Sequence, residues 1–137
     1  MIETQRHEDT KEVAENPLSY KIIGAAIEVH RILGGPGLLE SIYESALCHE
    51  LSLQGLKIQS QVPVEVYYKG IKIRDPMLID ILVDDRIIVE VKATEKDHPI
   101  YDVQLLTYLR LTGLRLGLVI NFGCRQIKEG IKRVING

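Results

Sequence analysis

Acidic and basic residues interrupt an otherwise apolar stretch that reads D-I-L-V-D-D-R-I-I-V-E-V-K, from Asp80 to Lys92. Because side chains alternate between the two faces of a strand, Glu90 and Lys92 share a face. If residues 84–86 form a three-residue hairpin loop, Asp80 falls opposite Glu90, with the side chains roughly 5 Å apart. The spacing therefore predicts two carboxylates and an ammonium group on one face of one hairpin.

Two carboxylates this close repel each other unless a cation lies between them, and a divalent metal is the usual cation. Mg²⁺ and Mn²⁺ are hard ions that prefer oxygen ligands. Such an ion can activate a water molecule, and a neighbouring lysine can stabilise the charge that develops on a phosphate. The pattern is typical of a site that cleaves phosphodiester bonds.

A solvated hairpin face with surface salt bridges would use the same residue types, so this alternative stays open. Two apolar residues, Leu82 and Ile88, also lie on the charged face. Both faces of the hairpin are therefore expected to be largely buried, as in a central pair of strands. Charged groups on a buried face need compensation, and a metal ion or a partner ion would supply it.

Two further groups of polar residues lie on predicted helices. Glu40 is in a first helical turn, where the helix dipole favours a carboxylate, but it could equally reach a metal as an extra ligand. Gln104 and Tyr108 are four residues apart, so they share a helix face. They could hold a phosphate or an exposed base, or they could be the polar face of an amphipathic helix.

The remaining sequence predicts the elements that position these residues. Residues 1–16 lack periodic apolar positions and are predicted to form a flexible arm, followed by a single domain over residues 17–137. Apolar periodicity and turn residues predict helices over residues 18–33, 38–53 and 99–111, strands near 58 and over 62–68, 71–73, 77–92 (a hairpin) and 116–122, and a short helix or strand over 127–135. This order predicts an α/β sandwich around a mixed sheet.

Composition sets the class of protein. The chain has 137 residues, 45% hydrophobic and 26% charged, which is typical of one soluble globular domain. No apolar run reaches the ~20 residues that a membrane span needs, and no signal peptide precedes the domain. Cys48 and Cys124 are expected to be reduced thiols, which favours a cytoplasmic location. A net charge of −2 argues against bulk electrostatic coating of nucleic acid, although six basic residues and one acid lie between Arg110 and Arg133.

Three separated segments resemble one known family. They are residues 33–43 (L-G-G-P-G-L-L-E-S-I-Y), 61–70 (Q-V-P-V-E-V-Y-Y-K-G) and 117–123 (G-L-V-I-N-F-G). Together they are similar to the GxxExxY proteins of the PD-(D/E)XK nuclease superfamily, over residues 18–137. The resemblance implies a restriction-endonuclease-like core, in which a mixed β-sheet is flanked by α-helices.

The resemblance also implies roles for individual residues. Asp80 is similar to the acidic metal ligand on the first core strand, and Glu90 and Lys92 to the E-x-K of the second. Together with the backbone carbonyl of Val91, the two acids would hold Mg²⁺ or Mn²⁺, and Glu40 would complete the site or recruit a second ion. Lys92 would orient the attacking water or stabilise the transition state.

Two helix residues extend this comparison. Gln104 and Tyr108 resemble the Q-x-x-x-Y motif of the exonuclease branch of the superfamily, which positions the strand that is cut. Gln104 would then contact a neighbouring phosphate oxygen. His30 and Tyr43 also match family positions, without an implied role.

The functional hypothesis is a metal-dependent nuclease that hydrolyses phosphodiester bonds of nucleic acid, with DNA the expected substrate, by a metal-activated water. The alternative is a non-catalytic module on a nuclease scaffold that binds nucleic acid or protein, and a smaller phosphodiester is a third possibility. No helix-turn-helix, zinc finger or aromatic stacking strip is evident. A homodimer or a protein partner is therefore expected to contribute specificity.

Overall fold

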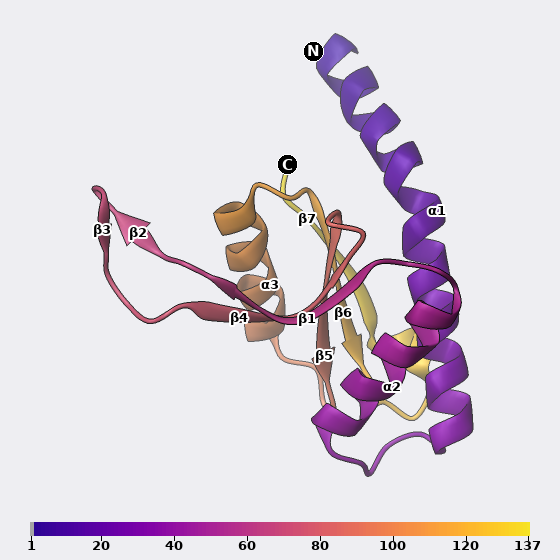
Figure 1. Ribbon diagram of the computed structural model, residues 1–137. Helices are drawn as coiled ribbons and strands as arrows, with labels where there is room; N and C mark the ends of the chain where they lie inside the picture. Colours follow the sequence, from indigo (N-terminus) through magenta and orange to yellow (C-terminus); the bar gives the residue numbers. More distant parts are fainter. Residues whose placement is uncertain (1) are drawn as a thin grey trace.

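The computed structural model describes the backbone of residues 2–137 and the side chains of residues 17–137. In chain order the elements are α1 (Ile2–Leu33), α2 (Glu40–Leu53), β1 (Ile58–Val64), β2 (Tyr67–Tyr68), β3 (Ile71–Lys72), β4 (Met77–Val83), β5 (Ile87–Lys92), α3 (Pro99–Thr112), β6 (Leu116–Asn121), the 3₁₀ turn η1 (Ile127–Gly130) and β7 (Ile131–Ile135) (Figure 1). No helix of the described part combines the length and the apolar character that a membrane span requires.

Five strands form the central sheet in the order β1-β4-β5-β6-β7. The β5–β6 pair is parallel and the other three pairs are antiparallel, so the sheet is mixed. Apolar residues of α1 and α2 pack on one face of the sheet, and those of α3 pack on the other. The predicted fold class is therefore confirmed, and the arrangement agrees with a restriction-endonuclease-like core.

The hairpin between β4 and β5 has the predicted loop and register. Val83 pairs with Ile87, and the loop is residues 84–86. Asp84 and Asp85 adopt left-handed backbone conformations, with φ of +51° and +54°, which short polar residues tolerate better than most. The Arg86 N–H closes the turn on the Val83 carbonyl at 3.0 Å.

Other boundaries differ from the predictions in instructive ways. The strand predicted over residues 62–68 is divided, because the chain leaves the central sheet after Val64 and pairs again only in the separate β2–β3 hairpin. The backbone of residues 2–16 is helical rather than irregular, in keeping with the helix propensity of its four Glu residues. The side chains of residues 1–16 are outside the described set, so the boundary between arm and domain stays a prediction.

Candidate active site

Asp80 of β4 and Glu90 of β5 face each other across the hairpin, as the register predicts. The regular pairing ends at Ile81 and Val89, one position before them. Beyond it, side chains bond the opposite backbone: the Asp80 N–H donates to Glu90 Oε1 at 3.2 Å, and the Val91 N–H donates to Asp80 Oδ2 at 2.9 Å. Each carboxylate is therefore held by the neighbouring strand.

The sheet is also distorted on the other side of Asp80. The β1–β4 pairing includes Ser60 with Ile81 and Val62 with Ile79, but the pair between them is missing. Its β1 member, Gln61, has a left-handed φ of +52°. The Gln61 amide donates to both carboxylate oxygens of Glu44, at 3.0 and 3.1 Å, and lies 3.5 Å from Asp80 Oδ1. Gln61 is a site residue that the sequence did not reveal.

Glu90 is almost entirely buried, with 3% of its surface exposed. Burial and the negative charge of Asp80 raise its pKa from an ordinary 4.5 to about 8, against the opposing effects of the Asp80 N–H and Lys92. At neutral pH, and without a further cation, this carboxyl is therefore largely protonated. The positive charge around Asp80 and Glu90 is therefore too small to keep both carboxylates ionised.

Glu40 and Glu44 bring two more carboxylates from α2. Partial burial raises the pKa of Glu40; the Lys92 charge lowers it, and the charges of Asp80 and Glu44 raise it further. Partial burial and the Asp80 charge also raise the pKa of Glu44, against the Gln61 hydrogen bond. Glu40 thus lies within electrostatic reach of both Asp80 and Lys92, and its role as an additional metal ligand stays a prediction.

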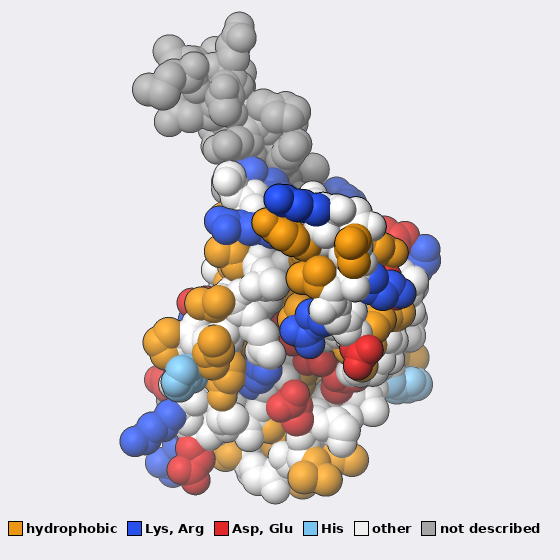
Figure 2. Space-filling model, turned by 90° about the vertical axis from the view of Figure 1, so that its left-hand side faces the viewer, with side chains coloured by type: hydrophobic (Ala, Val, Ile, Leu, Met, Phe, Trp, Pro, Cys, Tyr) orange, Lys and Arg blue, Asp and Glu red, His pale blue; other side chains and the backbone are white. Residues whose placement is uncertain are grey.

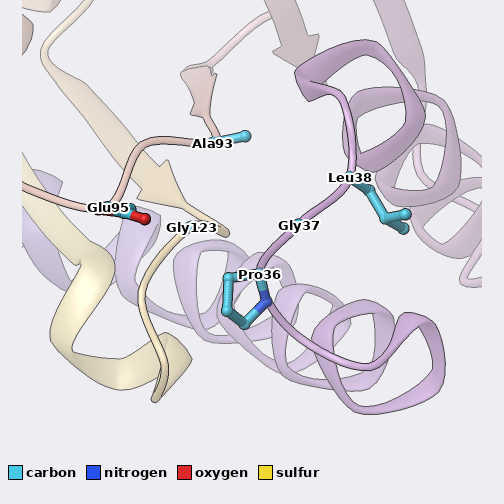
Figure 3. Close-up of a pocket in the computed structure, with 6 residues that line it drawn as sticks. All are labelled: Pro36, Gly37, Leu38, Ala93, Glu95 and Gly123. Atoms are coloured by element: carbon cyan, nitrogen blue, oxygen red, sulfur yellow. The ribbon is translucent and has the colours of Figure 1, made fainter.

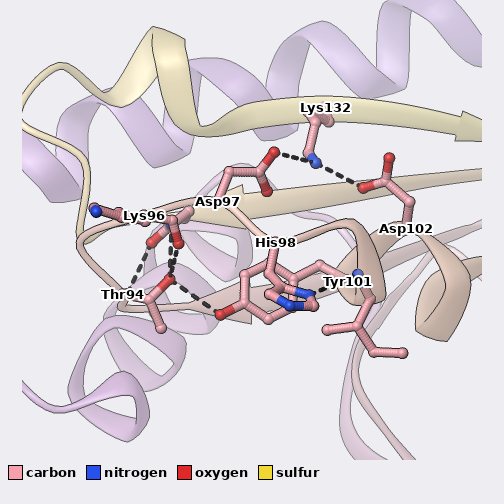
Figure 4. A network of polar contacts seen from close by, with 9 residues as sticks. Thr94, Lys96, Asp97, His98, Tyr101, Asp102 and Lys132 are labelled. Atoms are coloured by element: carbon pink, nitrogen blue, oxygen red, sulfur yellow. Dashed lines mark hydrogen bonds and ion pairs between the residues drawn. The ribbon is translucent and has the colours of Figure 1, made fainter.

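Lys92 is fixed by two residues of α3. Its Nζ donates to Gln104 Oε1 at 3.1 Å and lies 4.9 Å from the centre of the Tyr101 ring. The Tyr101 hydroxyl donates to Thr94 Oγ1 at 3.2 Å (Figure 4). The buried Asn121 bonds the same hydroxyl oxygen through Nδ2 at 3.1 Å and accepts the Thr94 N–H at 3.0 Å. The sequence predicted Lys92 and Gln104, but not this support.

Tyr108 lies deeper than its predicted role suggests, with 5% of its surface exposed and its ring packed against Ile88 and other apolar residues of the α3 side. Burial is the largest cause that raises the pKa of the Tyr108 phenol. The charges of Glu90 and Asp80 raise this pKa further, whereas the Arg74 charge lowers it. The charges of both carboxylates therefore act on its phenol, and contact with substrate stays a prediction.

Tyr43 of α2 and His30 of α1 hold the Gly-rich loop that precedes α2. Tyr43 is fully buried, stacks on Phe122 with ring centres 4.8 Å apart and donates its hydroxyl to the Gly35 carbonyl. His30 Nε2 bonds the Cys124 carbonyl oxygen at 2.9 Å. A side chain at Gly35 would meet the His30 ring at 3.4 Å, and its φ of +78° favours glycine. These contacts fix the loop, and with it the position of Glu40.

A cavity of about 480 Å³ opens between this loop and the ends of β5 and β6 (Figure 3). It is lined by Pro36, Gly37, Leu38, Ala93, Glu95 and Gly123. Among the lining residues, Ala93 directly follows Lys92 in the chain and Leu38 lies two residues before Glu40. Seen from the β2–β3 side, acidic side chains gather near the middle of the molecule with basic ones beside them (Figure 2).

The donor set suits a hard divalent cation. Asp80, Glu90 and Glu40 offer carboxylate oxygens, and the raised pKa of Glu90 reflects a shortage of positive charge that such an ion would relieve. Among the described side chains, no three His, Cys, Asp or Glu residues converge in a preformed metal-binding group. In this conformation the Asp80 and Glu90 carboxylates bond backbone N–H groups instead.

A mixed sheet with an acid, an acid and a lysine on two adjacent central strands defines a nuclease-like protein of the α/β class. The chain belongs to the PD-(D/E)XK nuclease superfamily, whose family model matches residues 16–134. No curated protein and no solved structure gave a match. The more specific likeness to GxxExxY proteins stays a prediction.

Proposed function

We propose that this protein is a metal-dependent nuclease that hydrolyses phosphodiester bonds of nucleic acid, with DNA the expected substrate. One observation carries the proposal. Glu90 is buried beside Asp80 on adjacent central strands, with Lys92 two residues further on the same strand. A surface salt-bridge cluster would not place a carboxylate at 3% exposure next to another carboxylate.

Asp80, Glu90 and the Val91 carbonyl, joined by Glu40, would hold Mg²⁺ or Mn²⁺. When bound, such an ion supplies Lewis-acid stabilisation of the phosphate and a nucleophilic water at neutral pH. Glu90 must be ionised to bind the ion. Because burial favours its protonated form in the metal-free protein, binding would release that proton.

Lys92 would provide a fixed positive charge beside the reacting phosphate. The Gln104 carbonyl oxygen and the Tyr101 ring hold its ammonium group, so little reorganisation is needed during the reaction. Because Gln104 uses its oxygen for Lys92, its amide N–H groups can donate to a neighbouring phosphate oxygen. Tyr108, whose phenol senses the charges of Glu90 and Asp80, is proposed to help position the strand that is cut.

We also infer a cytoplasmic location. Cys48 and Cys124 are both free thiols, as expected in a reducing compartment. Burial, with the Glu44 and Asp80 charges, raises the pKa of Cys48 to about 11, so this thiol is a poor nucleophile and a poor metal ligand.

The test is a cleavage panel of supercoiled, linear and single-stranded DNA and of RNA, with Mg²⁺, Mn²⁺ or EDTA. Wild type is compared with Asp80→Ala from a parallel preparation, which excludes a contaminating nuclease. Metal-dependent cutting that Asp80→Ala lacks is expected. Folded wild type that neither cuts nor binds Mn²⁺ in calorimetry would instead support a non-catalytic binding module.

A further inference from the structure

The β2–β3 hairpin projects from the body of the molecule and contributes no strand to the central sheet (Figure 1). Its turn is Lys69-Gly70, with φ of +50° and +79°, the left-handed pair that matches the twist of a two-residue hairpin. Tyr67 pairs with Lys72, and Tyr68 pairs with Ile71. A lone two-stranded hairpin is marginally stable in water, so a binding partner would stabilise it.

The two faces of this hairpin differ in character. Residues directly opposite each other share a face, and the Ile73 N–H donates to the Val66 carbonyl, which extends the register by one pair. One face is apolar and consists of Val66, Tyr68, Ile71 and Ile73. The other, which we call the polar face, consists of Glu65, Tyr67, Lys72 and Arg74.

The polar face has the residue types that bind nucleic acid without reading its sequence. Tyr67 is 61% exposed, so its ring is accessible. Lys72 forms an exposed ion pair with Glu65 at 3.1 Å, a weak interaction that a phosphate could replace. Residues 65–74 contain three basic residues and one acid.

The hairpin is continuous with a strand of the candidate active site, because β4, which carries Asp80, begins at Met77, three residues after Arg74. The Arg74 charge also lowers the pKa of the Tyr108 phenol, whereas the Glu90 and Asp80 charges raise it. A site with this many carboxylates repels a polyanion, and cations on the approach offset that repulsion. Lys72 and Arg74, on the chain that runs from the hairpin into β4, supply such cations.

We propose that the polar face of the β2–β3 hairpin binds a single-stranded nucleic acid and leads it to the carboxylate site. This inference rests on the proposed function. Lys72 and Arg74 contact backbone phosphates, and Tyr67 stacks on an unpaired base. A single strand fits better than a duplex, because a duplex hides the faces of its bases and a projecting tyrosine needs a free one.

The experiment measures fluorescence anisotropy of labelled 20-nucleotide DNA and RNA single strands, and of the DNA duplex, with intact protein in EDTA. Wild type is expected to bind one or both single strands more tightly than the duplex. Tyr67→Ala is expected to weaken that binding roughly tenfold. Arg74→Ala is expected to lower the slope of log affinity against log salt by about 0.7, the value for one phosphate contact.

Ile71→Ser is the matched control, because Ile71 is 68% exposed on the apolar face of the same hairpin. It is expected to leave the affinity within about twofold of wild type. The inference is overturned if Tyr67→Ala and Arg74→Ala bind like wild type. It is also overturned if Ile71→Ser abolishes binding by dissociating a dimer, since the hairpin would then join two copies of the chain.

The outcome is separable from that of the proposed function, because binding in EDTA needs no cleavage. Hairpin-dependent binding by a protein that cuts nothing would support the inference and contradict the nuclease proposal. Metal-dependent cutting, with unchanged binding in the hairpin variants, would support the nuclease proposal and contradict the inference.

Discussion

Replacing Glu90 by glutamine is expected to stabilise the metal-free protein at alkaline pH. The carboxyl is 3% exposed, and burial with the Asp80 charge raises its pKa to about 8. Glutamine has the same shape, stays neutral at every pH and can still accept the Asp80 N–H. The substitution therefore removes the cost of ionising this group and changes little else.

The sign and size follow from the shifted pKa. Because the folded-state pKa lies above the ordinary value of 4.5, the folded protein keeps this proton at a pH where the unfolded chain loses it. Stability linked to Glu90 is fully present below pH 4.5 and is lost as the pH rises to about 8. At about 1.36 kcal/mol per pH unit, the advantage of Glu90→Gln in free energy of unfolding grows by about 4 kcal/mol between about pH 5 and about pH 8.5.

Urea denaturation followed by circular dichroism in EDTA, at the two pH values, measures this advantage. The raised pKa values of Glu40 and Glu44 act in the same direction, but they are common to both proteins and cancel in the difference. Glu95→Gln is the control, since Glu95 is exposed. An advantage that does not change with pH, or a Glu95→Gln variant that behaves like Glu90→Gln, would refute the reasoning.

Four further predictions concern the metal, the lysine and two glycines. Mn²⁺ at about 100 times its dissociation constant should raise the free energy of unfolding of wild type by about 2.7 kcal/mol, and melting curves should show no comparable gain for Glu90→Gln. Tyr101→Leu removes the ring beneath Lys92, so kcat should fall roughly tenfold while calorimetry finds unchanged Mn²⁺ affinity; equal losses in both would mean a general structural defect. Gly123→Ala would place a Cβ 2.2 Å from the Thr94 carbonyl oxygen and should destabilise the protein by about 1–3 kcal/mol in thermal melts. Gly24→Ala, in open space within α1, should instead stabilise it by about 0.5–1 kcal/mol.

Strand alternation made the central part of the site predictable. The positions of Asp80, Glu90 and Lys92 on one hairpin depend on local spacing and on the length of the 84–86 loop, which the sequence contains directly. Gln104 was predicted on a helix that begins at Pro99, and the structure brings its Oε1 to Lys92; this helix begins at a clear signal, since His98 caps it and Pro99 opens it.

The residues that support the site were not predictable in the same way. Gln61 enters it through a left-handed backbone conformation, for which a lone glutamine gives no local signal. Tyr101, Thr94 and Asn121 meet only because the end of β6 lies beside the chain that follows β5. Such contacts depend on tertiary packing, and apolar periodicity does not report them.

The projecting hairpin shows the same limit. The Lys69-Gly70 turn was evident from the sequence, but the departure of the chain from the sheet after Val64 was not. The sequence therefore predicted Tyr67 and Tyr68 as part of a longer strand, although both are more than half exposed. Only the three-dimensional arrangement shows that these residues form a separate, projecting hairpin with both tyrosines exposed.

The most direct measurement compares wild type, Lys92→Ala and Lys96→Ala on the nucleic acid that wild type cuts, with Mn²⁺ binding followed in parallel. Lys96 is exposed and only its backbone carbonyl bonds Thr94, so its alanine variant is the matched control. Wild type and Lys96→Ala should cut at equal rates, and Lys92→Ala should bind Mn²⁺ but not cut. Full activity in Lys92→Ala would contradict the assignment of this lysine and with it the proposed site.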